Sequence, residues 1–153
     1  MKKLFFLISC IVLLYSCGPK SIYSKKVDFE QGTWDYEQVA KFNFSIVDTT
    51  TVYDLILKID HDAEFSNQNF YVKFYTKAPN LEMIEDVVSM ELANQFGQWN
   101  GECGSENCSV EILLQGKTKF KSIGDYTIDI EQYNRVENLE GLNSIELKLF
   151  EAK

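Results

Sequence analysis

The sequence predicts an all-β protein, a single antiparallel β-sandwich of jelly-roll or immunoglobulin-like appearance behind an N-terminal signal peptide. Strand-favouring residues dominate it, because Ile, Val, Thr and the aromatics make up 44 of the 137 residues from position 17 onward, against five Ala. Apolar and polar residues alternate in several short segments. Clusters of turn-forming residues separate these segments. Short alternating strands joined by turns are typical of a sandwich.

The first sixteen residues have the pattern of an export signal. Lys2 and Lys3 precede an uncharged run at residues 4–14. As a helix this run is about 16 Å long, too short to cross roughly 30 Å of hydrocarbon. The tetrapeptide LYSC that ends at Cys17 resembles the end of a bacterial lipoprotein signal, so residues 1–16 are expected to be removed and Cys17 to carry the lipid. An ordinary cleaved signal peptide with an incidental cysteine is the alternative.

The chain after Cys17 has the length of one domain. Residues 17–26 are expected to form a lipidated tether, and residues 27–153 the β-sandwich domain. The whole chain carries a net charge of −8, and removal of Lys2 and Lys3 with the signal makes it −10. Such a charge repels nucleic acid, so no nucleic-acid partner is expected. Two or more acyl chains anchor a protein stably without a basic patch.

Alternation predicts the strands in chain order. They lie at residues 40–46, 53–59, 70–74, 126–130 and 145–149, with a weaker strand at 110–114. In the first strand, Phe42 and Phe44 point one way and Asn43 the other. Turns are predicted at residues 48–51, 77–80 and 122–125. The segment at residues 84–96 fits a helix and a strand almost equally well, so its periodicity leaves the choice open.

Two cysteines are the first candidate site residues within the domain. Cys103 and Cys108 lie five positions apart in a glycine-containing loop. In an exported protein such a pair favours a disulfide, with free thiols or a metal site as alternatives. A zinc site needs two more ligands, and the chain has a single histidine. No metal and no cofactor is therefore expected.

The single histidine, His61, lies among acidic residues. Asp60, Asp62 and Glu64 could offer oxygens to calcium, although the sequence does not fit a twelve-residue calcium loop. A solvated loop with spare charge is the simpler interpretation. No nucleophile with an activating base accompanies His61, so no catalytic residue and no small-molecule substrate are expected, and the protein is not expected to be an enzyme.

Aromatic side chains are the other candidate binding residues. Trp34, Trp99, Tyr71, Tyr75 and Tyr133 could form a platform on which sugar rings stack. Core packing is the more common role of such residues, and the sequence favours it.

Several segments, in their order and spacing, resemble one family across nearly all of the chain after the signal. They are Gly32-Thr33-Trp34, Phe42-Asn43-Phe44, Asp48-Thr49-Thr50, Tyr53-Asp54-Leu55, Asn69-Phe70, Pro79-Asn80, Leu92-Ala93-Asn94, Gly97-Gln98-Trp99-Asn100-Gly101, Gly124-Asp125-Tyr126, Ile130-Glu131-Gln132, Arg135, Glu140-Gly141-Leu142 and residues 145–149. The chain is similar in these to the gliding motility lipoprotein GldH family. It departs from the family at Asp60 and His61, where a basic residue is usual, and in the Cys103 and Cys108 loop.

The resemblance implies a membrane-anchored accessory or scaffolding component of the gliding apparatus and its associated secretion machinery, whose proteins would be the partners. It implies lipid attachment at Cys17 and a strand at residues 82–91, and it implies no catalysis. Residues 18–23 lack an acidic cluster of the kind associated with surface export in such bacteria. The resemblance therefore favours an outer-membrane anchor with the body facing the periplasm. A lipoprotein that binds glycan on the cell surface is the alternative function.

Overall fold

The computed structural model describes residues 21–152, so the predicted signal peptide and Cys17 lie outside the described residues. The elements follow one another as β1 (Ser21–Asp28), η1 (Glu30–Gly32), β2 (Thr33–Asp35), β3 (Ala40–Ile46), β4 (Tyr53–Asp62), β5 (Asn69–Lys77), β6 (Ile84–Glu91), β7 (Glu102–Cys103), β8 (Asn107–Thr118), β9 (Gly124–Gln132), β10 (Asn138–Glu140) and β11 (Leu142–Glu151). Within the described residues, the single helical turn is η1.

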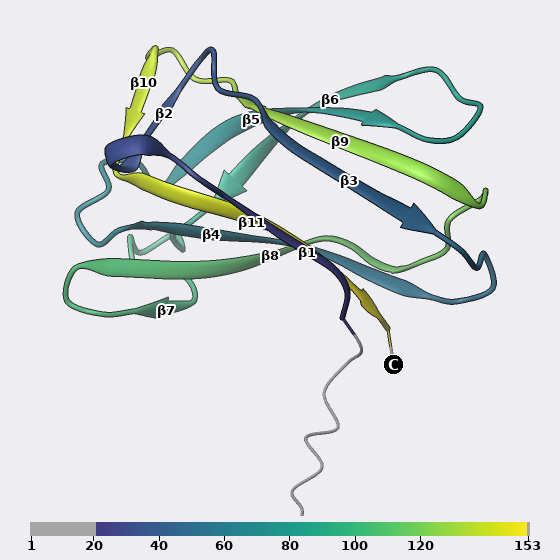
Figure 1. Ribbon diagram of the computed structural model, residues 1–153. Helices are drawn as coiled ribbons and strands as arrows, with labels where there is room; N and C mark the ends of the chain where they lie inside the picture. Colours follow the sequence, from purple (N-terminus) through teal and green to yellow (C-terminus); the bar gives the residue numbers. More distant parts are fainter. Residues whose placement is uncertain (1–20, 153) are drawn as a thin grey trace, which may run out of the picture.

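Two antiparallel sheets pack face to face (Figure 1). One has five strands in the order β1-β11-β4-β8-β7, and the other has four in the order β3-β9-β5-β6. The long strands change sheet at every connection except β5 to β6, which is the connectivity of a jelly roll. The predicted antiparallel sandwich is confirmed, and the jelly roll is the form that it takes.

Strict alternation builds the core between the sheets. In β3 and β4 every second side chain is buried, and the residues between them are exposed or half-buried. Phe42, Leu57 and Ile130 are fully buried where the two sheets meet. Each such side chain stabilises the fold by about 1.5–3 kcal/mol relative to an exposed one.

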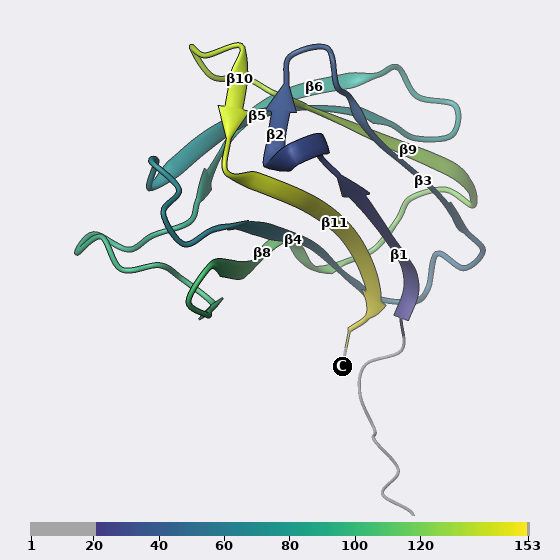
Figure 2. The ribbon, with the colours of Figure 1, turned by 60° about the vertical axis from the view of Figure 1, so that its left-hand side comes forward.

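A small ribbon made of β2 and β10 closes one end of the sandwich (Figure 2). Trp34 of β2 is fully buried there and stacks on Phe29 with ring centroids 4.5 Å apart. Its ring also packs edge-to-face with that of Phe70, with ring centroids 6.2 Å apart. The indole Nε1 donates a hydrogen bond to the carbonyl oxygen of Gln38 at 2.7 Å. Trp34 therefore links the ribbon to the core.

Three strands either differ from what the sequence pattern predicts or settle a choice that the pattern leaves open. The sequence predicts a tether through residue 26, yet residues 21–26 belong to β1, which pairs with β11 from Ser21 onward. The ambiguous segment contains a strand, β6, as the family resemblance implied. The strand predicted weakly at 110–114 is the centre of β8, which is twelve residues long.

Candidate functional site

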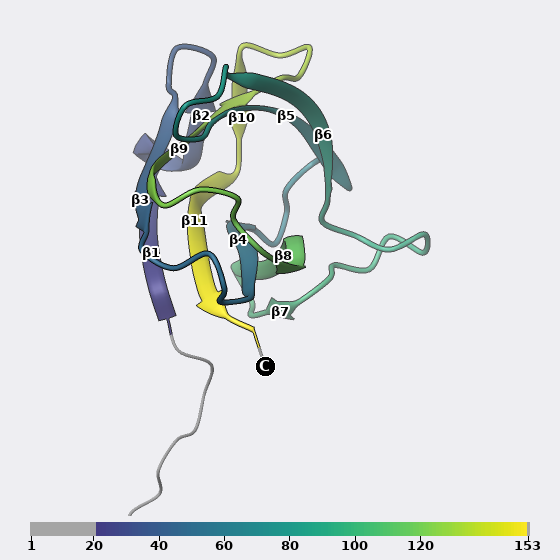
Figure 3. The ribbon, with the colours of Figure 1, turned by 90° about the vertical axis from the view of Figure 1, so that its right-hand side faces the viewer.

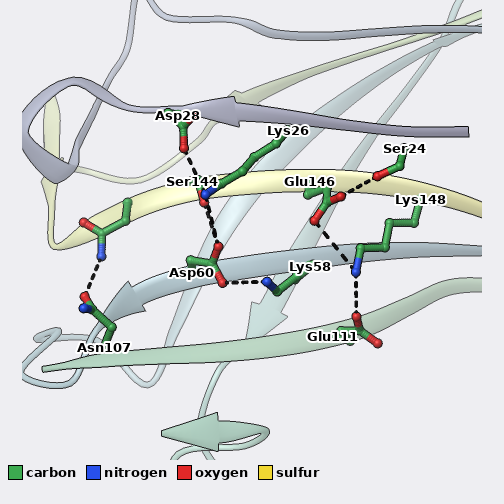
Figure 4. Close-up of polar contacts among 11 residues, drawn as sticks. Ser24, Lys26, Asp28, Lys58, Asp60, Asn107, Glu111, Ser144, Glu146 and Lys148 are labelled. Carbon is green, nitrogen blue, oxygen red and sulfur yellow. Dashed lines mark hydrogen bonds and ion pairs between the residues drawn. The ribbon is translucent and has the colours of Figure 1, made fainter. Parts of the chain in front are cut away.

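The outer face of the five-stranded sheet carries charged side chains that pair with one another (Figure 4). The Nζ of Lys58 lies 3.3 Å from Asp60, and the Nζ of Lys26 lies 3.6 Å from the same carboxylate. Burial raises the pKa of the Asp60 carboxyl. Hydrogen bonds from Ser109 and Ser144 and the charge of Lys58 outweigh burial, so the pKa of Asp60 lies below its ordinary value. Much of the charge on this face is thus compensated within the sheet.

The four-stranded sheet carries an open groove at the end where β9 leads into β10. Its volume is about 850 Å³, which is within the range of ligand sites. The groove is lined by Asn67, Asn69, Tyr71, Val87, Tyr133, Asn134, Arg135, Val136 and Leu139. We refer to this set as the β5–β9 groove.

Large side chains in the β5–β9 groove are unusually open to solvent. Tyr71, Val87, Tyr133 and Val136 are each 48–54% exposed, whereas most other large apolar side chains on β5 and β9 lie in the core. Contiguous exposed apolar surface with a polar rim commonly marks an interaction site. The β5–β9 groove is therefore the strongest candidate binding surface in residues 21–152.

A buried glutamine fixes the loop that forms one wall of the groove. Gln132 is 3% exposed, and its Nε2 donates to the carbonyl oxygens of Val136 and Glu137 at 3.0 and 2.9 Å. Its Oε1 accepts from the backbone NH of Asn134 at 3.1 Å. Because one side chain satisfies three backbone groups of this loop, the wall of the groove is held in a defined shape.

Asn134 attaches the same loop to the neighbouring strand. Its Nδ2 donates to the carbonyl oxygen of Tyr71 at 3.2 Å, and its Oδ1 accepts from the NH of Tyr71 at 3.0 Å. The NH of Tyr133 also donates to the Tyr71 carbonyl oxygen, at 2.8 Å. The asparagine side chain thus extends the pairing of β5 and β9 past the end of β9, so that both tyrosines lie in fixed positions.

The groove combines three kinds of binding group. Arg135 is the only arginine of the chain, and its guanidinium can hold a carboxylate through two parallel hydrogen bonds. Beside the groove, Nζ of Lys73 lies 4.6 Å from the ring centroid of Tyr133, and the hydrogen-bonded ion pair of Lys73 with Glu85 raises the pKa of Lys73. Amides and aromatic faces complete the surface. These groups suit an extended ligand that has both apolar and acidic or amide portions.

The structure joins Cys103 of β7 to Cys108 of β8, with sulfur atoms 2.00 Å apart. Just before them, Gly101 has a φ of +80°, and a Cβ there would lie 2.2 Å from the carbonyl oxygen of Ser109. This glycine is therefore required by the close approach of the loop to β8. The cysteine loop and the β5–β9 groove share no lining residue.

Replacing both cysteines, Cys103→Ser with Cys108→Ser, is expected to lower the free energy of unfolding by about 2 kcal/mol, because the short closed loop regains entropy in the unfolded chain. Denaturant unfolding of the parent and the variant measures this difference. Mass spectrometry of non-reduced peptides, after free thiols are blocked, tests the bond itself. Recovery of both cysteines in alkylated form would contradict it.

His61 is buried in the core side of β4 rather than displayed. Its side chain is fully buried, and its Nδ1 donates to the carbonyl oxygen of Asp62 at 2.8 Å. Its ring packs edge-to-face with that of Trp99, with ring centroids 4.7 Å apart. The Nε2 has no hydrogen-bond partner among the described residues. Burial lowers the pKa of His61 below its ordinary value. The side chain is thus a packed, neutral core residue at pH 7.

This burial predicts a pH dependence of stability. Because the pKa of His61 is lower in the folded chain than the unfolded value of about 6.5, the unfolded state binds more protons below that pH. Stability is then full above about pH 6.5 and falls on acidification, by at most about 1.4 kcal/mol per pH unit. Denaturant unfolding from pH 7.5 to 5.5 measures it. His61→Phe, which keeps a ring, should flatten the profile, and an equal slope in both proteins would contradict the assignment.

The other acidic candidates do not converge on an open site. Asp60 is bound by the two lysines described above, and Asp62 accepts a hydrogen bond from Nδ2 of Asn143 at 2.8 Å. In the described part of the chain, no cluster of three or more His, Cys, Asp or Glu could hold a metal ion. Across residues 21–152, no helix has the length and apolar character needed to cross a membrane.

The five aromatic candidates separate into two groups. Trp34 is a core residue, Trp99 packs on His61, and the hydroxyl of Tyr75 donates to Glu131 at 3.1 Å. Tyr71 and Tyr133 are brought together in the groove. Sequence reasoning missed the roles of Gln132 and Asn134; a run of polar residues directly after an alternating strand was the one available signal.

The jelly roll and its surface groove define the class: a small β-sandwich protein with an open groove on its four-stranded sheet. The comparison with known families gives the family. The chain belongs to the GldH lipoprotein family, whose model matches residues 21–149.

Two relatives match over nearly their whole length. A protein of Christiangramia forsetii named "Gliding motility lipoprotein GldH homolog" is 23% identical over 154 residues, which covers 96% of this chain and 94% of the relative. The "Gliding motility lipoprotein GldH" of Flavobacterium johnsoniae is 22% identical over 150 residues, covering 94% and 92%. No solved structure matches the chain.

Proposed function

We propose that this chain is a lipid-anchored accessory component of the gliding motility apparatus and its associated secretion machinery, and that the β5–β9 groove binds a protein of that machinery. Family membership and the names of both relatives support the motility role. The observation that carries the binding role is the groove itself, where exposed Tyr133 and the single arginine lie on a loop fixed by buried Gln132, beside exposed Tyr71 of β5. Cys17 is the proposed lipid attachment site, and the body faces the periplasm from the outer membrane.

A glycan-binding role is the second candidate, and it is favoured by one observation. Tyr71 and Tyr133 line the groove together with three asparagines, and stacking rings with amide donors suit a sugar chain. Two experiments separate the candidates. Protease treatment of intact cells leaves a periplasmic body intact and digests a surface-exposed one. Soluble cell-surface polysaccharide should bind the isolated protein only if the groove is a glycan-binding site.

Removing the binding groups of the groove is expected to stop gliding without unfolding the protein. Tyr133→Ala with Arg135→Ala deletes two exposed side chains, so stability should change little, while gliding speed should fall to that of cells lacking the protein. The matched control, Lys121→Ala with Ile123→Ala, removes exposed side chains at the opposite end of β9. Single-cell tracking at equal protein levels measures both. Parental speed in the groove variant would rule out the groove as the functional surface.

A further inference from the structure

β6 is an edge strand with one unpaired side. It pairs with β5 in continuous register from Asn69↔Glu91 to Thr76↔Ile84, with no shift along the way. Among the described strands none pairs with its other side, and β6 lies at the outer border of its sheet in Figure 3. A long, regular edge offers unpaired backbone NH and CO groups to another strand.

The sandwich is open along this edge. Val88 lies opposite fully buried Val72 and so faces the core side, yet it is 37% exposed; Ile84 is 54% exposed. On β8 of the facing sheet, Ile112 lies opposite fully buried Leu57 and so faces the core, yet it is only partly buried. The other flank is closed, because β1 meets β3 there and the Nζ of Lys25 donates to the carbonyl oxygen of Lys41 at 2.7 Å. Within residues 21–152, the flank at β6 is therefore the open side of the sandwich.

The open flank is strongly acidic. Residues 78–116, which include β6, β7 and most of β8, contain seven Asp or Glu and no Lys or Arg; Glu85 and Glu111 pair with Lys73 of β5 and Lys148 of β11. Asp86 lies opposite Phe74, a core residue that is 8% exposed, so its carboxylate is on the core-facing side of the edge. Charges directed inward on an edge strand hinder pairing with a second copy of the same strand. Antiparallel pairing of two β6 strands would also bring together the acidic residues of both copies, without a base in either strand.

We propose that the β6 edge binds an extended, basic strand of a partner protein by strand addition. Main-chain hydrogen bonds to β6 would supply affinity. Apolar side chains of the incoming strand would cover Ile84 and Val88, and a Lys or Arg would face Asp86. This inference deepens the proposed scaffolding function and rests on it, since it names the kind of partner segment that such a scaffold holds.

Ile84, Asp86 and Val88 share one face of β6, so the test peptide carries Val, Lys and Val at every second position, with Thr between them. This Val/Lys peptide, and a Val/Glu peptide with Glu in place of Lys, test the proposal directly on the lipidated chain in non-ionic detergent. Titration calorimetry measures binding, and amide hydrogen exchange locates it. The Val/Lys peptide should bind and slow exchange within residues 84–90, whereas a Val/Glu peptide should not. N-methylation along one edge of the peptide should abolish binding, and along the other edge should leave it, because only one edge donates to β6.

Variants of the protein complete the test. Asp86→Lys should weaken binding of the Val/Lys peptide by about tenfold or more, and Asp28→Lys, which makes the same charge change on β1, should leave it within about twofold. The proposal would be overturned by absent binding, by equal binding of both peptides, or by protection elsewhere than β6. It would also be overturned if light scattering shows a dimer of the parent protein whose population changes in the Asp86→Lys variant. None of these outcomes alters the gliding test of Tyr133 and Arg135, so the two proposals fail separately.

Discussion

Replacing Cys17 by alanine is expected to abolish both lipid attachment and gliding. The acyl chains are the proposed membrane anchor, and each buried methylene contributes about 0.8 kcal/mol, so their loss removes the whole affinity for the bilayer. Cells grown with labelled fatty acid should incorporate no label into the Cys17→Ala protein, which should accumulate as an unprocessed or mislocalised precursor.

Cys10→Ala is the matched control for this experiment, because Cys10 lies inside the predicted signal peptide. Its labelling and the gliding of its cells should equal those of the parent. Equal labelling of the Cys17→Ala protein would refute lipidation at this residue, and loss of label in the Cys10→Ala protein alone would move the site.

Trp34→Ala is expected to have the largest effect on stability, a loss of about 3–5 kcal/mol in the free energy of unfolding. The indole is fully buried and contacts Phe29 and Phe70, and its Nε1 hydrogen bond to Gln38 is lost as well. Small domains are stable by about 5–15 kcal/mol, so this single change removes a large share.

Trp99→Ala serves as the comparison for this prediction, because Trp99 is only partly buried, against the edge of the core. Urea unfolding followed by circular dichroism measures both variants. The destabilisation should be clearly larger for Trp34→Ala. An equal or smaller loss at position 34 would show that the ribbon of β2 and β10 is not held to the core as described.

The sandwich was predictable wherever a strand has one buried and one exposed face. β3 reads as strict alternation and is buried at every second residue, so its bounds could be predicted to the residue. β1 escaped prediction because most of its residues are exposed, as expected for an edge strand with polar side chains on both faces. β6 was ambiguous for a related reason: Ile84, Val87 and Val88 lie on both faces of an incompletely covered edge.

The groove could be predicted only in part. Tyr71 and Tyr133 were candidates by residue type, but their meeting depends on contacts between residues 63 apart, such as those of Asn134 with Tyr71. Sequence patterns report local periodicity, and this contact arises from strand register, which sets β9 beside β5. His61 shows the converse, because its acidic neighbours suggested exposure while the alternation of β4 directs it inward.

The most direct test of the proposed function is crosslinking from the groove in living cells. A photo-crosslinking amino acid at position 133, with one at position 123 as control, reports which molecules touch each end of β9. The account predicts a specific protein adduct at 133, identified by mass spectrometry as a component of the gliding or secretion machinery, and no such adduct at 123. Absence of a protein adduct at 133, or the same adducts at both positions, would contradict it.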